Sequence, residues 1–205
     1  MTAISYSNIR AWTECPYKWK LSYVDRLQRI STPRSLNMGS AVHVVMEQYL
    51  RSVAPEDAID AWVEDKIVDA TKAGIMSSET MVELEEIRDL SLAVGARAFD
   101  HLMQEWEVAV SPDGERLIEV KLFHTTEGIN FVGFVDVVLK HRDTNMLIVC
   151  DHKVQSSFAG DNYHEGDMQL PMYMHMLRHT HGLETHGSAI FSIRPRLPQP
   201  PAMLK

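Results

Sequence analysis

Two neighbouring strand-like segments, residues 129–140 and 146–153, constrain the fold of this chain more than any other feature. The first segment contains one acid, Asp136, and the second carries Asp151 near its end. A short polar link joins the segments, so an antiparallel hairpin is the predicted arrangement. If the hairpin is symmetric about residues 143–144, Asp136 lies directly opposite Asp151, about 5 Å away on the same face.

This pairing of carboxylates predicts a metal site. Two like charges at that distance destabilise a sheet unless a cation lies between them or one acid is protonated. Side chains alternate along a strand, so Lys153 projects from the same face as Asp151 and adds a positive group beside the acids. The hairpin therefore predicts a divalent-metal site with an adjacent lysine.

Five short motifs follow one another along the chain. In chain order they are Ser5-Tyr6-Ser7 with Cys15-Pro16, Gly39-x-x-x-His43, Gly133-x-x-Asp136, Asp151-x-Lys153 and Gln169-x-x-x-Tyr173. An acid-x-lysine pair alone occurs by chance in many proteins, but this order over most of the chain is specific. The chain resembles the PD-(D/E)XK nuclease superfamily, and within it the RecB-like exonuclease branch of phage recombination and CRISPR-adaptation nucleases.

The resemblance implies a metal-dependent DNA nuclease, most directly an exonuclease that hydrolyses phosphodiester bonds in recombination, repair or phage replication. It implies that Asp136 and Asp151 ligate Mg²⁺ or Mn²⁺, with His43 and the main-chain carbonyl of His152 as further ligands. Such a metal polarises the scissile phosphate and lowers the pKa of a bound water. Lys153 would orient that water or offset the charge that develops on the phosphate.

His43 has two interpretations. It lies in the apolar stripe of a helix expected over residues 35–52, where a lone histidine is usually a core residue. Its match to the Gly39-x-x-x-His43 motif favours the second interpretation, because the resemblance implies that this histidine reaches the metal. A histidine ligand shifts the preference toward Mn²⁺, since Mg²⁺ prefers oxygen.

Supporting residues flank the hairpin. The resemblance implies a glutamate near the metal on the strand expected over residues 116–124, which is Glu119, although a solvent-facing acid is the alternative. Gln169 and Tyr173 are four residues apart, share a helix face and are assigned by the resemblance to the DNA backbone. Gly133 lacks a side chain and is expected to let another backbone approach closely.

The expected fold is α/β (α+β), a mixed central sheet of about four or five strands flanked by helices. The resemblance implies a restriction-endonuclease-like core with a helical N-terminal part, and residues 1–205 are treated as one nuclease domain with a helical insertion at about 53–110. Expected helices cover residues 7–12, 16–24, 35–52, 55–72 and 79–107 and a segment from about 167, and expected strands cover residues 116–124, 129–140, 146–153 and 188–194.

The charge of the chain is unevenly distributed. The formal net charge is −8, which is unusual for a protein that binds DNA. Residues 1–34 carry a net +4, whereas residues 55–90 carry a net −8. The N-terminal segment is therefore the one expected to face phosphates, and the acidic segment is expected to face water or a basic partner.

The cysteine and hydropathy patterns limit the cellular compartment and the cofactors that we expect. Cys15 and Cys150 are far apart, which favours a reducing cytoplasm over a disulfide framework. An iron–sulfur cluster needs four ligands, so none is expected unless the natural chain continues past Lys205 with further cysteines. No run is long enough to span a membrane, and we expect a protein of a bacterial or phage-infected cytoplasm.

The C-terminal third is rich in histidine. His175, His179, His181 and His186 form no closed ligand set by their spacing, and we interpret them as solvated residues. Expected partners are DNA and either a second copy of the chain or a recombination protein. Two alternative functions stay open: a non-catalytic DNA- or protein-interaction module with the nuclease fold, and a DNA endonuclease.

Overall fold

The structure is a computed structural model that describes residues 3–27, 29–157 and 167–198. The chain divides into two compact units. The sheet unit comprises Met1–Ile30, Met103–His152 and Ala159–Phe191, and the helical unit comprises Ser31–Leu102, Lys153–Phe158 and Ser192–Lys205. The candidate acids lie in the sheet unit.

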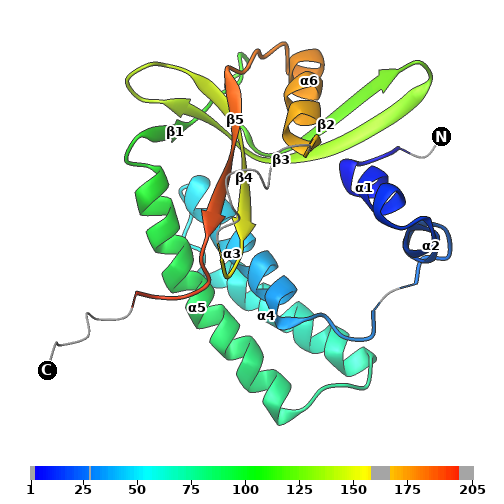
Figure 1. Ribbon diagram of the computed structural model, residues 1–205. Coiled ribbons are helices and arrows are strands. Elements are labelled where there is room, and N and C mark those ends of the chain that lie inside the picture. The colour runs from blue at the N-terminus through cyan, green and yellow to red at the C-terminus, as the bar shows by residue number, and fades with distance from the viewer. Residues whose placement is uncertain (1–2, 28, 158–166, 199–205) are drawn as a thin grey trace, which may run out of the picture. The chain divides into compact units, whose positions relative to one another are not determined.

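Five strands form one mixed sheet, in agreement with the expected fold class (Figure 1). They are β1 Trp106–Val108, β2 Ile118–Thr126, β3 Ile129–His141, β4 Leu147–Val154 and β5 Gly187–Ile193. The strand order is β1-β3-β4-β5, and β2 pairs with the same long strand β3 as β1 does. The pairs of β3 with β1, β2 and β4 are all antiparallel, so β3 is the central strand of the sheet.

The β3–β4 hairpin has the predicted register. Val137 pairs with Cys150 and Lys140 pairs with Leu147, so the hairpin is centred on residues 143–144. The link turns through Asn145, whose φ of 57° is the left-handed conformation that asparagine tolerates better than most residues. Local turn chemistry and strand alternation are thus sufficient to set this register.

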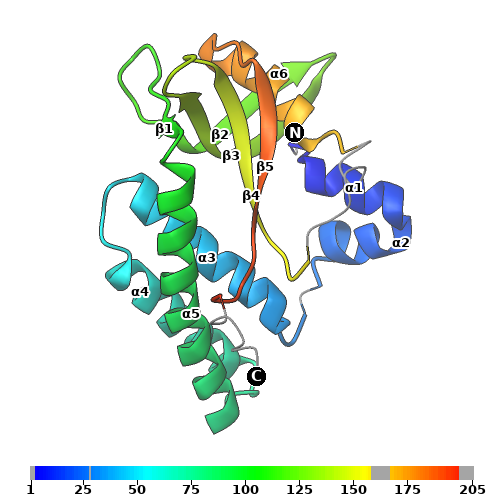
Figure 2. The same ribbon diagram turned by 60° about the vertical axis from the view of Figure 1, so that its left-hand side comes forward.

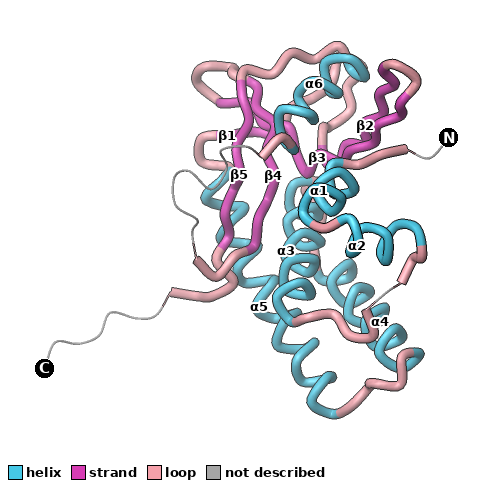
Figure 3. Tube along the Cα trace, turned by 45° about the vertical axis from the view of Figure 1, so that its right-hand side comes forward, coloured by secondary structure: helices cyan, strands magenta, loops and turns pink. Residues whose placement is uncertain are grey.

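Strand β5 runs parallel to β4, and the two lie side by side in Figure 3. The amide of His186 donates to the carbonyl of Leu147 at 2.7 Å, and the amide of Gln155 donates to the carbonyl of Ile193 at 3.0 Å. Residue numbers therefore increase in the same direction along β4 and β5, so the two strands are parallel. A parallel pair needs a long crossover connection, and helix α6, Gln169–His181, provides it.

Helix α6 packs on one face of the sheet. Its apolar residues share a core with residues of β2, β3 and β4. Figure 1 shows α6 against β2 and β3. The fully or nearly buried members of this core are Leu122, Val135, Val138, Val149, Leu170, Tyr173, Met176 and Leu177.

The N-terminal segment forms α1, Tyr6–Glu14, and α2, Pro16–Trp19, which continues as the π-helical turn η1, Lys20–Val24. The helix start expected at Ser7 was wrong, because the hydroxyl of Ser5 accepts from the amide of Asn8 and caps α1. Pro16 occupies the first turn of α2, as predicted.

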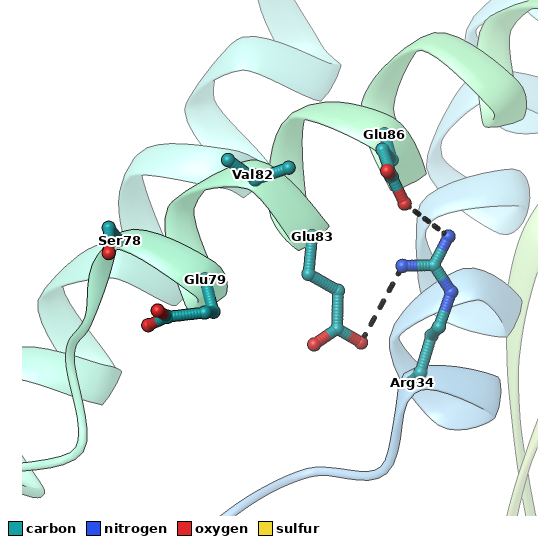
Figure 4. Close-up of a pocket in the computed structure, with 6 residues that line it drawn as sticks. All are labelled: Arg34, Ser78, Glu79, Val82, Glu83 and Glu86. Carbon is teal, nitrogen blue, oxygen red and sulfur yellow. Dashed lines mark ion pairs between the residues drawn. The ribbon is translucent and has the colours of Figure 1, made fainter.

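Helices α3 Arg34–Leu50, α4 Glu56–Lys72 and α5 Ser78–Leu102 make up most of the helical unit (Figure 2). Close packing of α3 on α5 depends on Gly95, where an added Cβ would lie 2.4 Å from Val45 Cγ1. Arg34 at the start of α3 forms ion pairs with Glu83 and Glu86 of α5, at 3.8 and 3.0 Å, beside a shallow pocket (Figure 4).

Two further expectations for this region were wrong. The long helix was expected to run to residue 107, but α5 ends at Leu102 and Trp106–Val108 form β1. Pairing of β1 with β3 outweighs the helical spacing at this end, because it satisfies main-chain groups and buries apolar surface together. Helix α3 runs from Arg34 to Leu50, whereas a helix was expected over residues 35–52.

No described helix is both long and apolar enough to cross a membrane. The polar loop expected at residues 154–166 falls largely, at 158–166, outside the described residues, as does the end of the proline-rich tail from residue 199.

Candidate active site

Asp136 and Asp151 are neighbours across the central hairpin. Val137 pairs with Cys150 in the antiparallel hairpin. In the same register, Asp136, which precedes Val137, lies opposite Asp151, which follows Cys150. Asp136 and Asp151 therefore lie on the sheet face opposite to Val137 and Cys150. Of the two carboxylates, that of Asp151 is contacted by helix α6, through Gln169.

A third acid extends this row onto strand β2. Glu119 lies between Ile118 and Val120, whose partners on β3 are the two residues that flank Asp136. Its φ of 50° is left-handed, a conformation that costs a non-glycine residue on the order of 1 kcal/mol. Strained backbone concentrates at functional sites, and Glu119 is half-buried, so its place near the metal stays a prediction.

The Asp136 carboxylate is fixed by the end of β4. Its Oδ2 accepts a hydrogen bond of 2.6 Å from the main-chain amide of His152. The Nδ1 atom of the His152 ring lies 3.8 Å from the same oxygen, and the side chains of Asp136 and His152 are 13% and 2% exposed. These contacts fix the orientation of the Asp136 carboxylate at the end of β4.

The Asp151 carboxylate is held from helix α6. Gln169 Nε2 donates to Asp151 Oδ1 at 3.1 Å and lies 3.4 Å from the hydroxyl of Tyr173. The main-chain amide of Gln169 donates in turn to Asp167 Oδ1 at 2.9 Å, at the start of the helix. The predicted common face of Gln169 and Tyr173 is confirmed, and it points toward the acids rather than away from them.

Gly133 makes room for the ring of Tyr173. A Cβ atom at Gly133 would lie 2.6 Å from Tyr173 Cε1, closer than any real contact of this kind. We expected Gly133 to let another backbone approach closely. The close approach is made by the aromatic ring of Tyr173 instead of a backbone. The Gly133-x-x-Asp136 motif sets how close α6 comes to the acid-bearing strand.

The charges of Asp136 and Asp151 act on the thiol of Cys150. Burial first, and then the negative charges of Asp136 and Asp151, raise the pKa of Cys150 to about 12. Cys150 is 1% exposed and lies inside β4. It is a protonated core residue.

Two of the expected site residues belong to the helical unit. Lys153 follows His152 directly in β4 and is half-buried, on the same side of the strand as Asp151 by alternation. His43 is half-buried on α3, one turn beyond Gly39. Their participation in the site stays a prediction.

The residues of the sheet unit fit a divalent cation by the chemistry of their donors. Mg²⁺ and Mn²⁺ bind carboxylate oxygens, so Asp136, Asp151 and Glu119 are the candidate oxygen donors. A carboxylate oxygen of Asp136 and a ring nitrogen of His152 lie within 4.8 Å of each other, close enough to share one ion. Sequence reasoning considered only the carbonyl of His152 and missed its ring. Alternation along β4 would direct the ring away from Asp151, and only the partner strand brings Asp136 to it.

The carboxylates of Asp136 and Asp151 stand on neighbouring strands of a mixed sheet, and each accepts a hydrogen bond from an N–H group. The sequence profile of the PD-(D/E)XK nuclease superfamily matches residues 3–204, and the chain belongs to this superfamily. The superfamily expected from the motifs is thereby confirmed. Comparison with curated proteins gives no significant match.

Solved structures agree on the fold. A crystal structure of a candidate exonuclease from Eubacterium rectale superposes with a TM-score of 0.59 at 14% identity, over 95% of this chain and 68% of that one. Protein VC1899 from Vibrio cholerae aligns over 82% of this chain and 54% of its own, at 10% identity and a TM-score of 0.25. The first likeness supports the restriction-endonuclease-like fold, and the second score is too low to carry an argument.

Proposed function

We propose that this protein is a metal-dependent DNA exonuclease of the RecB-like branch. The observation that carries the proposal is the hairpin register that sets Asp136 opposite Asp151, in a chain of the PD-(D/E)XK superfamily. The motif order along the chain and the candidate exonuclease from Eubacterium rectale support the exonuclease reading.

In this proposal the two acids are metal ligands and the neighbouring residues support them. Asp136 and Asp151 bind Mg²⁺ or Mn²⁺, with Glu119, His43 and His152 as further or supporting ligands. The bound metal supplies a polarised phosphate and a water of lowered pKa. Lys153 orients that water or stabilises the charge that develops on the phosphate oxygens.

Gln169 and Tyr173 position the acids and border the DNA. Gln169 donates to Asp151, which favours a positioning role for its amide. Tyr173 is 7% exposed and packs in the core, so its ring supports α6, and its hydroxyl is the part available to the Gln169 amide. Contact with the DNA backbone would then come from the start of α6.

The N-terminal helices are the proposed DNA-facing surface. Residues 1–34 carry a net +4, and the N-terminal helices expose the aromatic rings of Trp12 and Tyr17, which are 50% and 69% exposed. Cations contact phosphates, and exposed aromatic rings stack on unpaired bases, as a strand end would present them. Lys18 and Lys20 lie on the same two turns.

Digestion of linear against closed circular DNA tests the proposal. With Mn²⁺ or Mg²⁺, linear DNA should be degraded and covalently closed circles should survive, and Asp136→Asn should abolish the degradation. Cutting of both substrates would identify an endonuclease instead. Absence of cutting with either metal, while DNA is still bound, would favour the non-catalytic module.

A further inference from the structure

Three histidines gather on the surface of the sheet unit, away from the acid row. His124 lies near the end of β2, and His175 and His179 lie one turn apart on α6. The centroid of the His124 ring lies 5.3 Å from that of the His175 ring and 4.7 Å from that of the His179 ring. The centroids of the His175 and His179 rings are 4.5 Å apart. Each ring therefore contacts both others.

The scaffold beneath this cluster is well defined. Leu122, Met176 and Leu177 are buried in the core between β2 and α6. The hydroxyl of Thr180 donates to the carbonyl of Phe123 at 3.1 Å and joins the two elements at the level of the cluster. The three imidazoles therefore stand on elements whose packing is already fixed, as a preorganised ligand set requires.

The donors suit a transition-metal ion. One ring nitrogen from each histidine lies within 4.8 Å of the others. Tetrahedral Zn²⁺ with Zn–N bonds of about 2.0–2.1 Å needs nitrogens roughly 3.4 Å apart. His175 and His179 are exposed and His124 is half-buried, so small side-chain rotations can close this difference. Exposure also leaves the fourth position open to water.

The surroundings of His175 favour the neutral form of its ring. Burial first, and then the neighbouring rings of His179 and His124 and the charge of Arg178, lower the pKa of His175. A neutral imidazole binds a metal, whereas an imidazolium does not.

We propose that His124, His175 and His179 form a second metal site, which binds one Zn²⁺ or a similar borderline ion and clips helix α6 to strand β2. The site has nitrogen donors only, so it selects Zn²⁺, Ni²⁺, Co²⁺ or Cu²⁺ over Mg²⁺, in contrast to the oxygen-rich acid row. It lies on the same helix whose first residue, Gln169, holds Asp151. Metal bound here stabilises the helix that positions the acid row.

Calorimetric titration of the full, metal-stripped chain with ZnCl₂ in excess Mg²⁺ tests the site. The matched variants are His179→Gln on α6 and His124→Gln on β2, and the control is His181→Gln, a histidine of the same helix outside the cluster. Asp136→Asn is the background for all of them, so that the acid row contributes as little as possible. Thermal melts without metal verify that each variant folds.

The expected result is one Zn²⁺ equivalent in the background protein and in His181→Gln, and affinity at least tenfold weaker in His179→Gln and His124→Gln. Loss of outer-shell partners alone weakens binding about 10–100-fold, so loss of a ligand should exceed the lower limit. Co²⁺ should give the intense visible bands of a tetrahedral site, absent from both ligand variants. Unchanged Zn²⁺ affinity in either ligand variant, or an equal loss in His181→Gln, would overturn the three-histidine site.

Discussion

The side-chain amide of Gln169 holds Asp151 through a hydrogen bond of 3.1 Å between helix α6 and strand β4. This bond crosses from the crossover helix to the acid-bearing strand. It connects the packing of α6 on the sheet to the orientation of a proposed metal ligand. The first prediction concerns what this contact does.

Gln169→Leu should weaken metal binding and activity together. The substitution keeps roughly the volume but removes the donor to Asp151, and loss of such partners typically costs about 10–100-fold in metal affinity or activity. Mn²⁺ affinity by calorimetry and kcat by DNA degradation measure the two effects. If only the KM for DNA rises while Mn²⁺ affinity is unchanged, Gln169 contacts DNA rather than positioning Asp151.

Asp151→Asn should separate charge repulsion from metal binding. Without metal, the mutant should melt at or above the wild-type temperature, because like charges on neighbouring strands cost on the order of 1 kcal/mol. With Mn²⁺ at a hundredfold excess over its Kd, the wild type should gain about 2.7 kcal/mol and the mutant much less. Thermal melts in EDTA and in Mn²⁺ distinguish a metal-binding pair of acids from a purely structural pair. An equal gain from Mn²⁺ in both proteins would refute the metal-bridged pair.

Lys153→Ala should abolish DNA hydrolysis with the fold retained. Its charge is proposed to act on the attacking water or on the phosphate, and a well-placed cation of this kind contributes about 10²–10³ in rate. The matched control is Lys140→Ala on β3, whose ammonium pairs with Glu107 at 3.1 Å on the surface. Degradation of linear DNA by both variants is the measurement, and wild-type turnover by Lys153→Ala contradicts the assignment.

Cys15 and Cys150 should differ sharply in thiol reactivity. Cys15 is exposed, whereas Cys150 is buried and its pKa is raised to about 12. The thiolate is the reactive form, so an aromatic disulfide reagent at pH 8 should label only Cys15 in the native protein and both thiols in guanidinium. Rapid labelling of Cys150 in a Cys15→Ser variant without denaturant would show that β4 opens readily.

Gly133→Ala should destabilise the sheet unit by about 1–3 kcal/mol, because the new methyl group overlaps the ring of Tyr173. Gly39→Ala is the control. No atom lies within 4 Å of a Cβ there, and alanine in a helix interior gains up to about 1 kcal/mol over glycine. Urea unfolding of the two variants should therefore shift in opposite directions. A neutral Gly133→Ala would mean that α6 is free to move off β3.

Local sequence was sufficient for the central hairpin and for the family. The period of two along residues 129–140 and 146–153 and the polar link between them determine the register, because a slip by one residue would turn the apolar face outward. That register alone places Asp136 beside Asp151. The helices were also identified from their spacing, although their ends shifted where caps or β1 competed.

Tertiary structure decided which distant residues meet. Gln169 of α6 reaches Asp151 of β4, and Tyr173 of the same helix sits over Gly133 of β3. His124 joins His175 and His179 across 51 and 55 positions of sequence, since strand β2 runs beneath α6. No spacing along the chain encodes such contacts. They follow from the burial of apolar surface between two elements, which depends on the whole core and not on any local pattern.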